Sequence, residues 1–183
     1  DLVWIKPRNQ VENHTVHDST RGSTNQLATN STSAAREQSN TLQSFDSDGF
    51  TTGSDNNTNK NNINYVAWCW RAGGGTTGSN SDGSITSTVQ ASPLSGFSIV
   101  KYTGTGSNAT IGHGLSTAPD WIIMKNLDRA GYGWLVYHQA ISEEKYLVLN
   151  TGAAQTDQAS IFNDTAPTSS VFSVGTDTFG NYN

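Results

Sequence analysis

Charged residues are scarce in this sequence. Only 14% of its 183 residues are charged, and 15 acidic residues outnumber 10 basic ones. With a net charge of -5 and no basic cluster, the chain lacks the electrostatic attraction that nucleic acids and anionic membranes require. We therefore expect no nucleic-acid partner. The surface must be covered by hydroxyl and amide groups, a composition typical of secreted and virion β-proteins.

Cysteine and long apolar runs are nearly absent as well. Cys69 is the only cysteine, so the chain can form no internal disulfide and contains no CxxC metal or redox motif. Because Cys69 lies in the most apolar segment, we expect a buried, inert thiol. No apolar run reaches transmembrane length, which predicts no membrane insertion. The first residues carry neither an initiator methionine nor a signal-peptide pattern, so we expect a piece of a longer chain.

Amphipathic helical periodicity is also missing, since no stretch of a dozen residues shows a helical apolar stripe. Short alternating apolar segments predict strands instead, over residues 2–6, 96–102, 120–126, 133–138 and 145–150. Phe45 and Phe50 flank an Asp-Ser-Asp-Gly sequence, which predicts a hairpin. The sequence therefore predicts an all-β fold, and we expect an antiparallel β-sandwich.

The densest apolar segment is NYVAWCWRAGGG, at residues 64–75. Its alternation gives two apolar faces, one carrying Tyr65 and Cys69 and the other carrying Trp68 and Trp70. A strand that is apolar on both faces is typical of the interior of a packed sheet. We therefore expect an inner strand whose tryptophans anchor the core, in preference to a platform for a ligand.

The two halves of the sequence resemble each other at a spacing of roughly 120 residues. The matching segments begin at Asp1 and Asp120, at Val16 and Val136, and at Leu42 and Thr168. This spacing predicts a tandem repeat of domain size. If the copies are equivalent, we expect the first copy, residues 1–75, to lack its leading strands and the second copy, residues 96–183, to lack its final strand. A Gly/Ser/Thr-rich linker is expected over residues 76–95.

Several motifs in a fixed order give the chain a family resemblance. They are SFDSDGF, NYVAWCWRAGGG, the segment Ser79 to Val89, GFSIVKYTGTGSNATIGHGL and APDWIIMKN. This succession resembles repeats in tail-fibre and other virion-surface proteins of marine tailed bacteriophages. That resemblance covers nearly the whole chain and implies a concanavalin-like or jelly-roll β-sandwich, located on a virion surface or outside the cell. It carries no catalytic motif, and it implies a fragment of a longer fibre.

Two Asp-Gly segments are candidate metal sites. Asp46 and Asp48 precede Gly49, and Asp82 precedes Gly83, so each segment offers carboxylate oxygens before a sharp bend, as calcium loops do. The distal bidentate acid of a full calcium loop is missing at the usual distance. Simple Asx-Gly turns therefore remain the alternative to a Ca²⁺ site.

Candidate ligand-binding residues are Tyr132, Trp134 and His113. Tyr132 and Trp134 stand beside glycines at the margin of a loop, where aromatic faces could stack on sugar rings. His113 lies between glycines in IGHGL, and we expect it to be an exposed turn residue. No nucleophile, zinc-protease or nucleotide-binding motif is present, and nothing pairs two carboxylates as a glycosidase requires.

Three functions remain as hypotheses. The leading one is a non-enzymatic virion-surface module of a phage tail fibre or appendage, with host-surface glycan as its ligand. The second is a purely structural or decoration repeat that binds no small ligand. The third is a polysaccharide depolymerase, which would need a cleft with two carboxylates. In the first two cases we expect other virion subunits or neighbouring repeats as partners, and a homo-oligomer.

Overall fold

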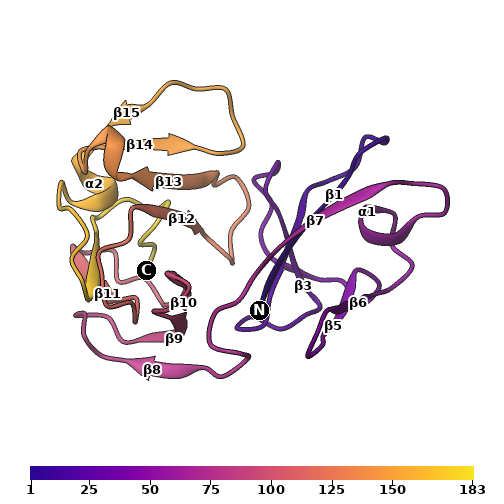
Figure 1. Ribbon diagram of the computed structural model, residues 1–183. Helices are drawn as coiled ribbons and strands as arrows, with labels where there is room; N and C mark the ends of the chain where they lie inside the picture. The colour runs from indigo at the N-terminus through magenta and orange to yellow at the C-terminus, as the bar shows by residue number, and fades with distance from the viewer.

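The computed structural model describes residues 1–183 and consists of two lobes (Figure 1). The first lobe contains the strands β1 to β7, and the second contains β8 to β16. Every pair of named strands is antiparallel, and the helices are single short turns. The predicted all-β fold is confirmed.

A five-stranded sheet and a hairpin make up the first lobe. The sheet has the order β4-β3-β2-β1-β7, and the helix α1 (Asn56–Asn59) follows the hairpin β5-β6. The strands are β1 (Leu2–Pro7), β2 (Thr15–Asp18), β3 (Asn25–Ala28), β4 (Arg36–Glu37), β5 (Leu42–Phe45), β6 (Phe50–Thr52) and β7 (Tyr65–Trp70). Phe45 and Phe50 face each other across the hairpin, which confirms the turn predicted between them.

Three sheets make up the second lobe, with the orders β10-β9-β8, β11-β16 and β12-β13-β14-β15. The first two contain β8 (Gly78–Asn80), β9 (Ser87–Ser92), β10 (Phe97–Lys101), β11 (Ala109–Gly112) and β16 (Val171–Val174). The third contains β12 (Trp121–Lys125), β13 (Trp134–His138), β14 (Lys145–Val148) and β15 (Thr156–Asp157), and the short helices are η1 (Gln139–Ile141) and α2 (Ala159–Phe162). Residues 76–95, expected to be a linker, thus carry β8 and β9, and β9 pairs with β8 on one side and with β10 on the other.

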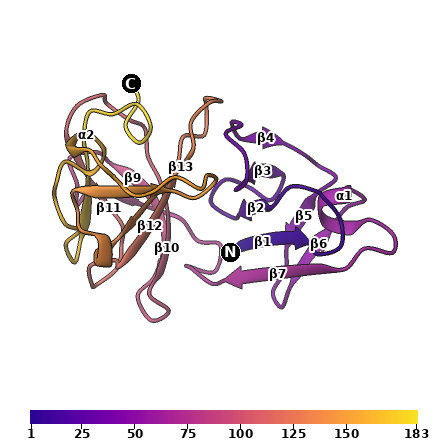
Figure 2. The same ribbon diagram turned by 90° about the horizontal axis from the view of Figure 1, so that it is seen from above.

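The central apolar strand lies at an edge, contrary to the prediction. β7 pairs only with β1 and forms the outer margin of the first lobe (Figure 2). Its Trp68 is 46% exposed and Cys69 is also exposed, so the expected buried thiol and core position are wrong. Both apolar faces of β7 make packing contacts. Tyr65 packs on the small core of the first lobe, and Trp70 stacks on Phe97 of the second lobe.

The two lobes share one pattern of backbone hydrogen bonds. Strands β1 to β4 correspond to β12 to β15, at a spacing of about 120 residues. Val16 pairs with Leu27 as Val136 pairs with Leu147. Four backbone N–H to O=C bonds of the first lobe have a counterpart in the second. In each case the first-lobe bond is given before its counterpart: Ser19 to Asp1 and Gln139 to Asp120; Thr29 to His14 and Leu149 to Trp134; Gln38 to Thr24 and Gln158 to Glu144; Asn59 to Asp55 and Asn181 to Asp177. The same main-chain path is therefore followed twice.

The lobes differ in the size of their cores. Nine buried residues form the core of the second lobe, between the sheets β12–β15 and β11–β16: Ile85, Ile111, Met124, Leu135, Tyr137, Ile161, Phe162, Phe172 and Val174. The buried cluster of the first lobe contains just Val3, Ile5 and Leu42, with the partly buried Phe45, Phe50 and Tyr65 packed against it. This difference makes the contact between the lobes important for the smaller one.

Candidate functional site

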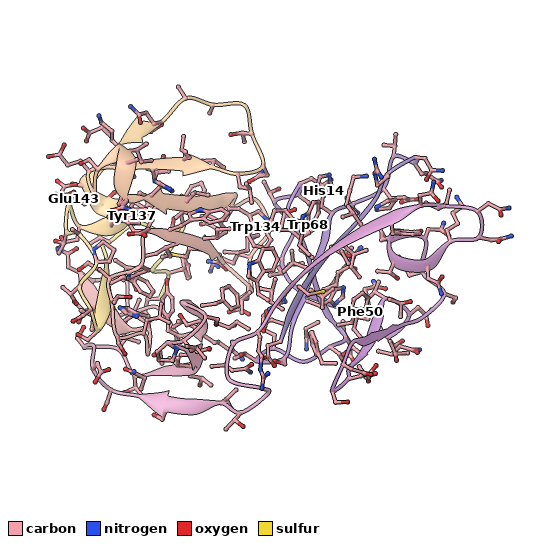
Figure 3. All side chains as sticks on the ribbon, in the orientation of Figure 1. His14, Phe50, Trp68, Trp134, Tyr137 and Glu143 are labelled. Carbon is pink, nitrogen blue, oxygen red and sulfur yellow. The ribbon has the colours of Figure 1, made fainter.

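A shallow groove runs along the boundary between the lobes. The first lobe contributes Trp4, His14, Thr29 and Asn30, and the second contributes Leu149, Asn150, Thr151 and Gly152. We call this set the junction groove. In Figure 3, His14, Trp68 and Trp134 all lie where the lobes meet, whereas Glu143 lies on the far side of the second lobe. The groove is thus built by both lobes together.

Trp4 provides the aromatic wall of the junction groove. It lies on β1 directly opposite Trp68 of β7, and the two ring centroids are 5.8 Å apart at an angle of 59°. Trp4 is half-buried, while Trp68 is exposed over nearly half of its surface. Two tilted indoles beside a groove offer flat apolar faces of the kind on which the C–H faces of a sugar ring can stack.

Two corresponding turns supply the polar walls. Asn30 Oδ1 accepts a hydrogen bond of 3.0 Å from the N–H of His14, and Asn150 Oδ1 accepts one of 2.9 Å from the N–H of Trp134. The carboxamide oxygens therefore hold the turns in shape. The amide nitrogen of Asn30 donates to Asn13, whereas that of Asn150 donates to no group of the chain. Asn150 Nδ2 is thus available to a ligand in the groove.

His14 is the one titratable residue in the junction groove. Burial lowers the pKa of its imidazole from the usual value, and the nearby Lys6 ammonium lowers it further. The ring is therefore neutral at pH 7 and can donate or accept one hydrogen bond. Since the groove contains no carboxylate, its chemistry is that of a neutral, hydrogen-bonding surface.

A second hollow adjoins the groove on the outer face of the strands β12 to β14. It is lined by Trp121, Val136, His138, Ile141, Leu147, Val148, Leu149, Thr151 and Ala153, so it shares Leu149 and Thr151 with the groove. Trp121 is 54% exposed and lies opposite the exposed His138. This hollow too contains no Asp or Glu, and most of its lining is apolar.

Trp134 does not form the expected exposed platform. Its side chain is only 6% exposed, and its indole Nε1 donates to the carbonyls of Ala28 at 3.0 Å and Ser31 at 3.2 Å. A tryptophan of the second lobe thus caps a turn of the first. Tyr132 is half-buried and packs edge to face on Phe179, with the centroids 5.2 Å apart. The glycines beside these aromatics therefore mark a junction instead of an open loop.

His113 is internal, contrary to the prediction of an exposed turn. It is 2% exposed, its Nε2 lies 3.1 Å from the carbonyl oxygen of Thr168, and its Nδ1 accepts the N–H of Leu115 at 3.1 Å. Burial lowers the pKa of this imidazole, so the neutral tautomer with hydrogen on Nε2 satisfies both contacts. A glycine follows because Gly114 adopts a positive φ of 70°. His113 therefore ties the end of β11 to the segment that precedes β16.

The three aspartates considered for Ca²⁺ lie in two separate places. Asp46 belongs to the hairpin of the first lobe, where its carboxylate accepts from the hydroxyls of Ser44 and Thr51. Asp82 lies in the second lobe and accepts from the amide of Asn80. No group of three or more His, Cys, Asp and Glu side chains gathers anywhere in the structure. Asp46 thus belongs to a backbone turn in which its N–H donates to the carbonyl of Gly49, and Asp82 follows an Asx turn in which Asn80 Oδ1 accepts the N–H of Asp82 at 2.9 Å.

Sequence reasoning missed the residues that line the groove. Asn30 and Asn150 occupy corresponding positions in the two halves, and that match was visible in the sequence because NQLATN and KYLVLN end on the same residue. Trp4 lies in an apolar strand, which conceals its half-exposed ring. The alternation of apolar and polar residues within a strand did not indicate that the two lobes pack against each other.

Comparisons with curated proteins and with solved structures found no similar protein in either set. None of the helices has the length and apolar character needed to cross a membrane. A family model described as a domain of unknown function, DUF7483, matches residues 1–183. The chain therefore belongs to the DUF7483 family.

Proposed function

We propose that the chain is a non-enzymatic module of a virion-surface fibre or appendage, in which copies of one β-rich unit follow each other. The observation that carries this proposal is the shared hydrogen-bond pattern of the two lobes, docked side by side. A unit that repeats and docks on its neighbour is suited to extended assemblies. The proposal also includes a β-sandwich ancestry of the unit, which agrees with the antiparallel sheets packed around the larger core.

We further propose that the junction groove binds glycan on the surface of a host. The tilted pair Trp4 and Trp68 supplies stacking faces, and Asn150 supplies a free amide donor. Such a mixture of apolar faces with a few placed polar groups is typical of small-ligand sites. A groove without carboxylates favours binding over hydrolysis, because glycosidases use two carboxyl groups.

A glycan array tests this proposal directly. Gly152 lines the groove, and a Cβ added there meets nothing within 4 Å, so Gly152→Arg fills the groove without distorting the backbone. Gly49, in the hairpin of the first lobe, is equally unconstrained, so Gly49→Arg is a matched control of equal charge. We expect the wild type and Gly49→Arg to bind the same glycans, and Gly152→Arg to lose them.

Two further measurements separate the alternatives. Arrays with calcium and with chelator would give equal binding if the Asp-Gly turns hold no metal required for it. A reducing-sugar assay on any bound polysaccharide would give no new chain ends if the module is not a depolymerase. Absence of glycan binding under every condition would leave the purely structural repeat, which the shared pattern of the lobes supports equally well.

A further inference from the structure

One edge of the second lobe is open where the corresponding edge of the first is covered. β1 lies between β2 and β7, and all six of its residues pair with β7. Its counterpart β12 pairs with β13 on one side and with no strand on the other. An unpaired strand edge presents a row of free N–H and C=O groups that can template another strand.

Counterpart hydrogen bonds identify which groups of β12 face this open edge. The carbonyl of Asp1 accepts from Ser19 at 2.8 Å and that of Asp120 accepts from Gln139 at 2.9 Å, so both point toward the inner neighbouring strand. In an antiparallel ladder, backbone groups alternate between the two sides of a strand. The main-chain groups of Trp121, Ile123 and Lys125 therefore point outward.

Side-chain exposure agrees with a missing neighbour. Trp4 is half-buried under Trp68 of β7, with ring centroids 5.8 Å apart. Its counterpart Ile123 is 37% exposed, and the adjacent Trp121 is 54% exposed. Large apolar side chains beside an unpaired edge are unusual in a protein that leaves the edge free, because such an edge promotes association.

We propose that β12 binds, by antiparallel strand addition, a strand of the β7 type donated by a neighbouring repeat outside this chain. This inference rests on the proposed function as a module of a repeat-built assembly. The β7 of this chain is already paired with β1 over six residues, so it cannot serve both edges. Main-chain bonds give affinity in such additions, and alternate side chains give specificity.

The register of the added strand follows from that of β1 and β7. Leu2, Trp4 and Lys6 pair with Trp70, Trp68 and Val66. Trp121, Ile123 and Lys125 would accordingly face the donor's residues equivalent to Trp70, Trp68 and Val66. The donor tryptophan in the central position would cover Ile123 as Trp68 covers Trp4.

A synthetic peptide can stand in for the donor strand. The probe is the labelled peptide NINYVAWCWRA, residues 62–72, with Cys69→Ser to prevent oxidation. We expect it to bind the whole chain in fluorescence anisotropy, and a scrambled peptide not to bind. N-methylation at Trp68 removes an N–H directed at Ile123 and should weaken binding by about tenfold or more, whereas N-methylation at Ala67, whose N–H points away, should not.

Protein variants and hydrogen exchange locate the bound peptide. Ile123→Pro removes an outward N–H and leaves the ladder with β13 intact, a position where edge strands tolerate proline, so it should abolish binding while Ile123→Val retains it. In the wild type, the peptide should slow amide exchange at Trp121, Ile123 and Lys125. Slowing at β1, equal effects of the two N-methyl groups, or no binding beyond the scrambled peptide would each overturn the inference. A glycan array with Gly152→Arg is independent of β12, so failure here is distinguishable from failure of glycan binding.

Discussion

Replacing Trp134 by phenylalanine removes the hydrogen bonds from Nε1 that tie the second lobe to the turn at Ala28 and Ser31. The ring remains buried, so the change chiefly removes the two hydrogen bonds across the boundary, while the carbonyl of Ala28 keeps the N–H of Ser31 at 3.1 Å. Each lost hydrogen bond costs about 0.5–1.5 kcal/mol, and the change removes two of them. We therefore expect Trp134→Phe to lower the free energy of unfolding by about 1–3 kcal/mol. The melting temperature of a chain of this size should fall by about 2–4 °C for each kcal/mol.

Urea denaturation followed by circular dichroism measures this effect, and Trp121→Phe is its matched control. Trp121 is 54% exposed and makes no hydrogen bond through its indole, so its replacement should change stability by less than about 0.5 kcal/mol. Trp134→Ala should be more severe, at about 3–5 kcal/mol, because it also empties a buried site. If Trp134→Phe is no more destabilising than Trp121→Phe, the bonds across the boundary do not hold the lobes together.

Three further predictions follow from local geometry. A Cβ at Gly53 would lie 2.3 Å from the carbonyl oxygen of Asn40, so Gly53→Ala should destabilise the fold by about 2 kcal/mol or more, and Gly49→Ala should be neutral in the same urea titration. Burial, the largest cause, lowers the pKa of His17 from 6.5 to about 4, so protonation disfavours the folded state. Stability should be complete above about pH 6.5 and should fall by about 3 kcal/mol as the pH drops toward 4, a loss that His17→Asn should remove. Cys69 is exposed, so a thiol reagent should modify one cysteine in the folded chain without denaturant, and slow modification would contradict the edge position of β7.

The strands and the hairpin could be predicted because their signals are local. Alternating apolar residues indicated β10, β12, β13 and β14, since a pleated strand presents successive side chains to opposite faces. The hairpin at Phe45 and Phe50 could be predicted because a tight turn demands glycine and aspartate. The corresponding hydrogen bonds of the two lobes lie at the spacing at which the sequence segments match.

The environment of the tryptophans could not be predicted, because alternation does not reveal what covers each face. β7 is apolar on both faces, which indicated a central strand, yet it lies at an edge where Trp70 stacks on the other lobe. Trp134 stands beside glycines like an exposed residue, but its indole N–H caps a turn more than a hundred residues away in sequence. Contacts between the lobes depend on how the lobes dock, and the local sequences of β7 and β13 carry no signal of that docking.

The corresponding strands β2 and β13 differ on their inner faces, and this difference explains why the junction matters. β13 places Leu135 and Tyr137 in a core of nine residues, whereas β2 places Thr15 and His17 above a core of three. Thr15 Oγ1 and His17 Nε2 are buried without hydrogen-bond partners, and each such group costs about 1–3 kcal/mol. The first lobe therefore gains little from its own core and depends on its bonds to the second. Since the same boundary forms the junction groove, a ligand bound there would contact both lobes and should stabilise the weaker one most.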